Sequence, residues 1–304
     1  TAFITGGASG AGFGQACVFG DAGCRIVIAD IRRNAIDEAL DTLKARGIDA
    51  YGVELDITDR KAYAAAADKV EKDFAPVDLL FNTAGVSIFG PLEKATYEDY
   101  DWIMGVNFNG VVNGMQTFVP RMIERGKGGY IVNTASLGCF VAASVAGIYS
   151  ASKFAVHGIT MAMRDALTPY GIGVSVLCPA NIRSNIAESV DTRPAHLANS
   201  GYAVDEDELN ALREIYSQGM DPEELDGTGP VLHHSLSGSP ADAGGDLQTG
   251  ARRPPADGQR QGRSGEAPRG DDEIPRSART DGQGEVWQGV KAPAPPRLTC
   301  KAAR

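Results

Sequence analysis

Short apolar runs alternate with segments of helical periodicity along residues 2–178. Six runs rich in Val, Ile and Leu are flanked by turn residues, as in strands buried on both faces of a sheet. They cover residues 2–5, 25–30, 52–56, 77–81, 129–133 and 173–178. Apolar residues spaced three and four apart predict helices that begin near 15–19 and cover 34–46, 61–74, 97–123 and 148–167. This alternation predicts an α/β fold, a Rossmann-like doubly wound parallel sheet.

The composition changes near residue 226. Residues 227–304 contain 13 Gly and 9 Pro among 78 residues, but only nine of Val, Ile, Leu, Phe, Met, Trp and Tyr. So little apolar surface cannot offset the entropy of ordering the segment. We therefore predict one catalytic domain over 1–226 and a disordered Gly/Pro/Ala/Arg-rich tail over 227–304. The same composition fits a natural interaction tail or a shifted reading frame, and both explanations stay open.

Charge and cysteine content narrow the class of protein. The chain has 29 basic and 39 acidic side chains, a net charge of −10, which argues against nucleic acid or anionic lipid as partners. No apolar run approaches the roughly 18 to 20 residues of a membrane span, and no leader segment is visible. The five cysteines are scattered without a C-x-x-C pair, so no metal site is predicted. We expect a cytoplasmic protein.

A glycine-rich segment at residues 5–14 joins the first predicted strand to the first helix. Glycines there allow positive φ angles and bring backbone N–H groups close to a pyrophosphate at the helix N-terminus. Asp30 ends the second strand, where a carboxylate accepts the ribose 2′-OH of NAD and repels the 2′-phosphate of NADP. Arg32 and Arg33 could pair with that phosphate or lie solvated at the start of a helix. The pattern favours NAD over NADP.

A second cluster of polar residues carries candidate chemistry. Tyr149 and Lys153 are four residues apart, which places them on one face of a predicted helix. Ser136 follows a predicted strand, and Asn107 lies in the preceding predicted helix. Each residue taken singly has an ordinary structural explanation, but the four together predict an acid/base site.

Together these motifs resemble those of the short-chain dehydrogenase/reductase family over about residues 1–226. Asp56 matches the adenine-contacting acid of the family, and residues 82–85 resemble its Asn-Asn-Ala-Gly signature with Thr as the second residue. At residues 179–184, Ala and Ser replace the family's usual Gly and Thr near the nicotinamide carboxamide. The cofactor contacts that the resemblance implies are Thr5, Gly6, Ser9, Gly10, Ala11, Gly12, Asp30, Asp56, Ile57, Asn82, Ala84, Gly85, Lys153, Pro179, Ile182 and Ser184.

The resemblance also implies a catalytic tetrad of Asn107, Ser136, Tyr149 and Lys153. Tyr149 would be the acid/base, its pKa lowered from about 10 by the Lys153 ammonium and the nicotinamide charge. Ser136 would hold the substrate oxygen, Lys153 the nicotinamide ribose, and Asn107 a water of the proton relay. The implied activity is NAD(P)-dependent hydride transfer between a secondary alcohol or ketone and the cofactor.

Finer similarity suggests a substrate. Residues 89–94, 100–110 and 179–188 resemble bacterial Cα-dehydrogenases of lignin-derived β-aryl ethers, which oxidise a benzylic alcohol with NAD. An aromatic substrate needs an apolar pocket, and four residues could line it or simply pack in the core. These are Phe89, Cys139, Phe140 and Val141. Arg183, Glu188 and Arg193 are expected at a solvated loop edge above the site.

The C-terminal part of the chain leaves two possibilities for its activity. Family members continue with a further helix and a last strand, whereas here the resemblance fades near residues 223–225. We expect an active homodimer or homotetramer assembled through the two long central helices. The alternative is a catalytically silent, nucleotide-binding or unstable product that lacks the end of the fold.

Overall fold

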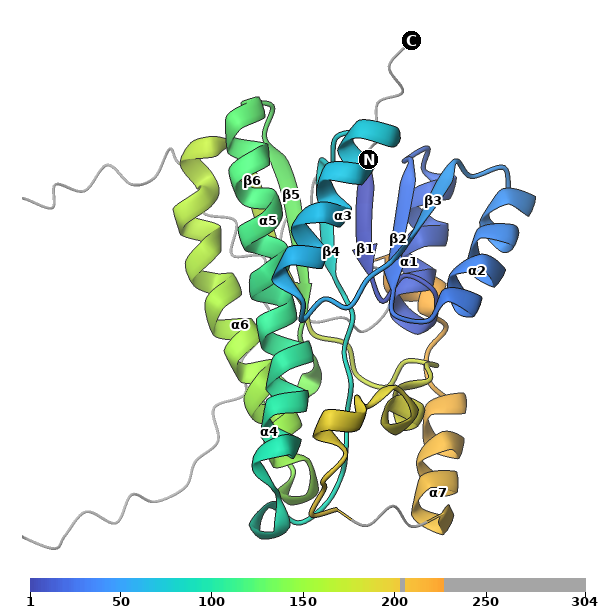
Figure 1. Cartoon of the computed structure of the whole chain (residues 1–304), viewed down its shortest axis with the longest axis vertical. Helices are drawn as coiled ribbons and strands as arrows, with labels where there is room; N and C mark the ends of the chain where they lie inside the picture. The colour runs from blue at the N-terminus through green and yellow to red at the C-terminus, as the bar shows by residue number, and fades with distance from the viewer. Residues whose placement is uncertain (203–205, 227–304) are drawn as a thin grey trace, which may run out of the picture. The chain divides into compact units, whose positions relative to one another are not determined.

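Six strands pair in one parallel sheet, which is drawn at the centre of Figure 1. The strand order is β3-β2-β1-β4-β5-β6 and every pair is parallel. The strands are β1 Ala2–Thr5, β2 Ile26–Asp30, β3 Ala50–Glu54, β4 Leu79–Asn82, β5 Gly129–Thr134 and β6 Ile172–Leu177. The order reverses between β1 and β4, so the carboxyl ends of these two strands open a crevice. The predicted doubly wound sheet is confirmed.

The computed structural model describes residues 1–202 and 206–226. Its α-helices are α1 Gly10–Asp21, α2 Arg33–Ala45, α3 Arg60–Asp73, α4 Tyr97–Met104, α5 Gly110–Arg125, α6 Gly147–Leu167 and α7 Glu206–Ser217. Within these residues no helix is both long and apolar enough to cross a membrane. The predicted tail, 227–304, lies outside the described residues.

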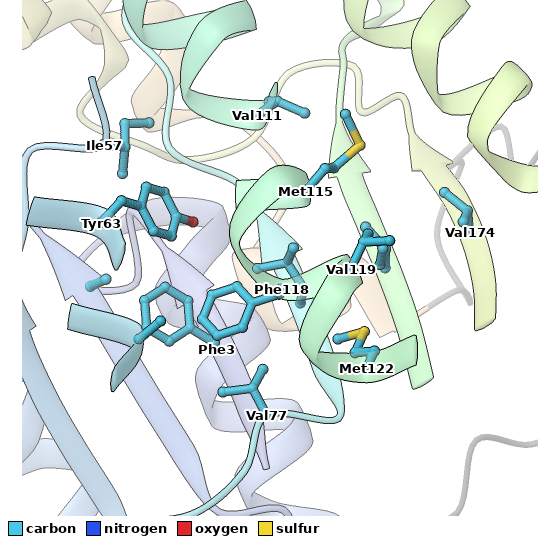
Figure 2. Close-up of a cluster of buried hydrophobic side chains, with 14 of the residues drawn as sticks. Phe3, Ile57, Tyr63, Val77, Val111, Met115, Phe118, Val119, Met122 and Val174 are labelled. Carbon is cyan, nitrogen blue, oxygen red and sulfur yellow. The ribbon is translucent and has the colours of Figure 1, made fainter. Parts of the chain in front are cut away.

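Successive residues of a strand point to opposite faces of the sheet and pack into two separate hydrophobic cores. Along β1, Ala2 and Ile4 pack toward α1 and α2, whereas Phe3 packs into the larger cluster beneath α3, α5 and α6. Figure 2 shows Phe3 beside Phe118 of α5, with ring centroids 4.9 Å apart. Because both faces are covered, β1 and β2 are buried along their whole length. Helices on both faces hold the strand ends in fixed positions.

The predicted helix 97–123 is interrupted. Its two parts, α4 and α5, are joined by a π-helical segment, Gly105–Asn109. The side chain of Asn107 leaves the helix here to bond both the N–H and the C=O of Val86. A single wide turn of this kind is typical of functional sites. The 3.6-residue periodicity alone could not reveal it.

The C-terminal described segment was not predicted. After α7, a 3₁₀ helix, Pro222–Asp226, packs against α1. Gly14 permits this contact, since a Cβ there would lie less than 3.0 Å from the Pro222 carbonyl. Ile182 and Met220 form a parallel bridge that joins this segment to the loop after β6. The segment therefore lies against the loops that follow the strands.

Candidate active site

A cavity of about 520 Å³ lies beyond the carboxyl ends of the strands. It combines the first glycine turn, the loops after β4, β5 and β6, and one residue of α7. Most of the predicted site residues line it, namely Gly6, Ser9, Gly10, Ala11, Gly12, Asp30, Asp56, Ile57, Ala84, Gly85, Ser136, Tyr149, Lys153, Pro179, Ile182 and Ser184. Thr5, Asn82 and Asn107 are absent from its lining.

The glycine turn packs closely against the loops that follow β4 and β6. Gly6 and Gly10 have φ angles of 65° and 50°. A Cβ on Gly6 would lie 2.9 Å from the Cα of Ala84, and a Cβ on Gly10 would lie 2.9 Å from the Cβ of Ser184. Ser9 precedes α1, but its side chain makes no cap bond to the helix. The N-terminus of α1 can therefore offer backbone N–H groups to an anion in the cavity.

Asp30 and Arg32 form an ion pair that lines the cavity at the end of β2. The Arg32 guanidinium donates to Asp30 Oδ1 at 3.1 Å and Oδ2 at 3.3 Å, and to Ser9 Oγ at 2.8 Å. Asp30 is 7% exposed, whereas Arg33 points away and pairs with Asp37 on the surface of α2. Of the two arginines considered in the sequence, only Arg32 lines the cavity.

Thr5 and Asn82 support the cavity from below rather than facing it. Thr5 Oγ1 accepts hydrogen bonds from the backbone N–H groups of Thr83 and Ala84, at 2.9 and 3.1 Å. Asn82 donates through Nδ2 to Asn133 Oδ1 at 2.8 Å. Both side chains are at most 2% exposed, because the strand ends hold them between β1, β4 and β5. The cofactor contacts expected of these two residues stay a prediction.

Tyr149, Lys153 and Ser136 meet at one end of the cavity. The Lys153 ammonium lies 5.5 Å from the centre of the Tyr149 ring and donates to the Thr134 carbonyl at 3.0 Å. Burial lowers the pKa of Lys153 to about 8. Burial also raises the pKa of Tyr149 to about 12, with the Ser136 hydroxyl acting in the opposite direction through a hydrogen bond. Without bound ligand, the phenol is therefore protonated at neutral pH.

Asn107 is fully buried and its amide is committed to other groups. Oδ1 accepts from Val86 N–H at 2.8 Å, while Nδ2 donates to the Val86 carbonyl at 2.9 Å and to Ser152 Oγ at 3.1 Å. Ser152 in turn donates to the Tyr149 carbonyl. The side chain thus ties the loop after β4 to the helix of Tyr149.

The apolar lining of the cavity differs from expectation. None of Phe89, Cys139, Phe140 and Val141 lines it. Cys139 is buried in the core, Phe140 packs on His157, and Val141 is 67% exposed. The apolar and aromatic side chains that do line the cavity come from the loop after β4, from α4, from residues 186–197 and from α7. They include Val86, Trp102, Ile186, Leu197 and Tyr216.

Sequence reasoning missed Trp102 and Tyr216. Trp102 is nearly buried in α4 and follows the core periodicity, so its sequence position does not reveal a cavity contact. Tyr216 belongs to α7, in a stretch for which no element was predicted. Only the fold brings α7 to the cavity.

The predicted solvated edge is wrong for Arg193. Its side chain is 7% exposed and pairs with the fully buried Asp99 of α4 at 2.7 Å. Arg183 and Glu188 are partly exposed and pair with Asp221 and Arg213, as expected of a loop edge. A buried charge needs a partner, and Asp99 supplies it for Arg193.

The fold and this cavity define an NAD(P)-binding oxidoreductase of the Rossmann type. Comparison with known families matches residues 1–195 to the family described as short chain dehydrogenase. The chain belongs to this family, and it is an NAD(P)-dependent alcohol dehydrogenase. The resemblance inferred from the sequence motifs is confirmed.

Individual members of the family show which relatives this chain resembles. The chain is 57% identical over 226 residues to a C alpha-dehydrogenase of Sphingobium sp. (strain NBRC 103272 / SYK-6), covering 74% of each chain. The crystal structure of the LigD apo form from the same strain is 50% identical, with a TM-score of 0.59, and covers 75% of this chain and 97% of that one. A short chain dehydrogenase/reductase from Burkholderia phymatum in complex with NAD is 34% identical, with a TM-score of 0.70, and covers 74% and 82%.

Proposed function

We propose that this enzyme oxidises a secondary benzylic alcohol of the aryl ether type to the ketone, with NAD as the hydride acceptor. The observation that carries the proposal is the Tyr149–Lys153–Ser136 cluster, which opens into a cavity with aromatic and aliphatic walls. The similarity to a C alpha-dehydrogenase supports the same substrate class. Bound NAD supplies a hydride acceptor, so that the alcohol yields a ketone, reduced cofactor and a proton.

The residues of the cluster have separate roles in this proposal. Tyr149 takes the hydroxyl proton of the alcohol, or returns it in the reverse direction. Lys153 stabilises the phenolate by its charge and holds the nicotinamide ribose. Ser136 donates a hydrogen bond to the substrate oxygen, where negative charge develops. Asn107 acts from outside the cavity, because its amide already binds Val86 and Ser152.

The glycine turn fits the dinucleotide. Gly6, Gly10 and Gly12 let the backbone pack closely around the N-terminus of α1, whose N–H groups would bind a pyrophosphate, and Asp56, which lines the cavity, would contact the adenine. Gly85 leaves space beside Lys153, since a Cβ there would lie 3.4 Å from Nζ. Asp30 favours NAD, since its carboxylate would repel a 2′-phosphate and also neutralises Arg32.

Cofactor choice can be tested at Asp30. Asp30→Ser removes the carboxylate and frees the Arg32 guanidinium for a phosphate. We expect the ratio of kcat/KM with NAD to kcat/KM with NADP to fall about tenfold or more, or ~1.4 kcal/mol. Asp37→Ser, which removes an exposed carboxylate on α2, is the matched control and should leave the ratio unchanged. An unaltered ratio in Asp30→Ser would exclude Asp30 as the determinant.

The substrate assignment is tested by a panel. NADH formation is measured for a β-aryl ether benzylic alcohol beside aliphatic secondary alcohols of similar size. We expect kcat/KM to favour the aryl substrate about tenfold or more, because its rings would contact Trp102 and Tyr216. Tyr216→Ala should reduce that preference, whereas Ile215→Ala, at an exposed neighbour on α7, should keep it. Equal kcat/KM values for all alcohols of the panel would refute the substrate assignment.

Self-association is also part of the proposal. Several apolar side chains near and along the first half of α6 remain exposed in the single chain, namely Phe140, Val141, Val145 and Phe154. Apolar surface of this kind is typical of an interface. It supports the homodimer or homotetramer expected from the sequence, while the cytoplasmic location stays a prediction.

A further inference from the structure

We propose that Asp99 and Arg193 are positioning residues that set the affinity for the alcohol substrate, by holding residues 186–202 in place where they line the cavity. The inference rests on the proposed function, since it assigns the part of the cavity that this segment lines to the alcohol. Neither residue lines the cavity. Their effect is exerted through the segment that they hold.

Asp99 collects hydrogen bonds from two distant parts of the chain. On its own helix it completes a capping box with Thr96, whose backbone N–H donates at 2.9 Å. From the other segment it accepts from Arg193 at 2.7 Å, from Ser200 Oγ at 2.7 Å and from Gly201 N–H at 3.1 Å. Burial opposes its charge, yet these bonds outweigh burial and lower the pKa of Asp99 to about 2.

Arg193 extends the anchor to the cavity wall. Its guanidinium donates to the carbonyls of Leu197 and Asn199, and thereby fixes the turn that follows it. It also lies 5.0 Å from the centre of the Trp102 ring. Trp102 and Leu197 both line the cavity, so one charged pair orients two parts of the wall.

Residues 186–202 supply several side chains of the cavity wall. Ile186, Ser189, Thr192, Pro194 and Leu197 all face the cavity. Other hydrogen bonds also attach the segment: the Ser87 N–H donates to Ser189 Oγ at 3.1 Å, and Thr96 Oγ1 donates to the Asn199 carbonyl at 3.0 Å. Tyr149 and Lys153 lie on α6, outside this segment. Loss of the anchor should therefore weaken alcohol binding more than cofactor binding.

The test compares Asp99→Asn and Arg193→Lys with the wild-type full chain. Asp99→Asn keeps the shape but removes the charge, and Arg193→Lys keeps the charge but removes the fork. We expect Asp99→Asn to raise KM for the alcohol about tenfold or more, with KM for NAD changed less than about twofold. Arg193→Lys should show a smaller increase. Asp37→Asn removes a carboxylate from an exposed arginine pair and should alter neither constant.

Amide hydrogen exchange on the same proteins gives a readout that needs no substrate. In both variants exchange should accelerate in residues 186–202 while α1, α2 and α3 keep wild-type rates. The proposal would be overturned if KM for the alcohol and KM for NAD rose equally, or if exchange accelerated throughout the fold. Asp99 and Arg193 would then stabilise the fold as a whole rather than position the substrate segment. If Asp99→Asn does not fold, Arg193→Lys decides by the same criteria.

Failure of the proposed function would look different. A wild-type chain that does not oxidise the aryl ether alcohol refutes that substrate, and KM is then measured with whichever secondary alcohol the panel identifies. The exchange measurement keeps its meaning in either case. Unchanged exchange in residues 186–202 of both variants refutes the anchor alone.

Discussion

Lys153 and Tyr149 show how burial and charge compete at a single pair of side chains. Burial is the largest influence on both groups: the pKa of Lys153 falls to about 8 and that of Tyr149 rises to about 12, so the charged form of each is disfavoured. A phenol with a pKa of about 12 is a poor base at neutral pH. In the proposed mechanism, positive charge from Lys153 and from the oxidised cofactor would therefore be needed near the ring.

This balance predicts a pH dependence. The rate of alcohol oxidation at saturating NAD should rise with pH, because Tyr149 must lose its proton to act as a base, and its apparent pKa should lie below 12. Lys153→Met removes the stabilising charge, so we expect the apparent pKa to move upward by about 1 to 3 units. Lys69→Met, at an exposed site on α3, should leave the profile unchanged. A profile that does not move in Lys153→Met would contradict the role of its charge.

Site residues were predicted best where their spacing along the chain determines how they lie relative to one another. Tyr149 and Lys153 share a helix face, and the glycine turn connects adjacent elements, so local spacing places both. Arg32 and Arg193 could not be assigned in this way. Their environments depend on Asp30 and Ser9 in one case and on Asp99 in the other, and the contact with Asp99 spans 94 positions. Long-range contacts of this kind have no signature in a single sequence.

At the scale of elements, the turn between β1 and α1 is shaped by close backbone approach. Gly12 lies inside α1, and a Cβ there would come within 3.0 Å of the Gly6 carbonyl. That atom belongs to the backbone, so a neighbouring side chain cannot move aside to relieve the contact. The strand–turn–helix unit was predicted from its glycines. The π segment and α7 were not, because both are maintained by partners far away in sequence.

Gly12→Ala should therefore destabilise the enzyme. We expect a loss of about 1–3 kcal/mol in the free energy of unfolding, from forced repacking, together with weaker NAD binding. Gly158→Ala is the matched control, because nothing lies within 4 Å of a Cβ at that position in α6. It should stabilise the chain by about 0.5–1 kcal/mol. Urea unfolding measures both changes, and a neutral Gly12→Ala would show that the turn tolerates a side chain.

At the scale of the whole molecule, the net charge of −10 averages two unlike parts. Residues 1–226 hold 18 basic and 30 acidic groups, and every predicted site residue lies among them. The match to the C alpha-dehydrogenase likewise extends over 226 residues. Within the described part, the C-terminal elements reach back to the cavity through Tyr216 and to α1 through Pro222. The site is therefore assembled from nearly the full length of that part.

The most direct test is NADH formation from a β-aryl ether benzylic alcohol by the purified full chain, comparing wild type with Tyr149→Phe. Tyr149→Phe removes one hydroxyl and should reduce kcat/KM by about 10²–10⁴-fold. Tyr170→Phe removes the same atom from an exposed ring and should retain wild-type activity. NADH formation that persists in Tyr149→Phe would contradict the role of Tyr149 as acid/base, and its absence in the wild type would contradict the aryl ether substrate.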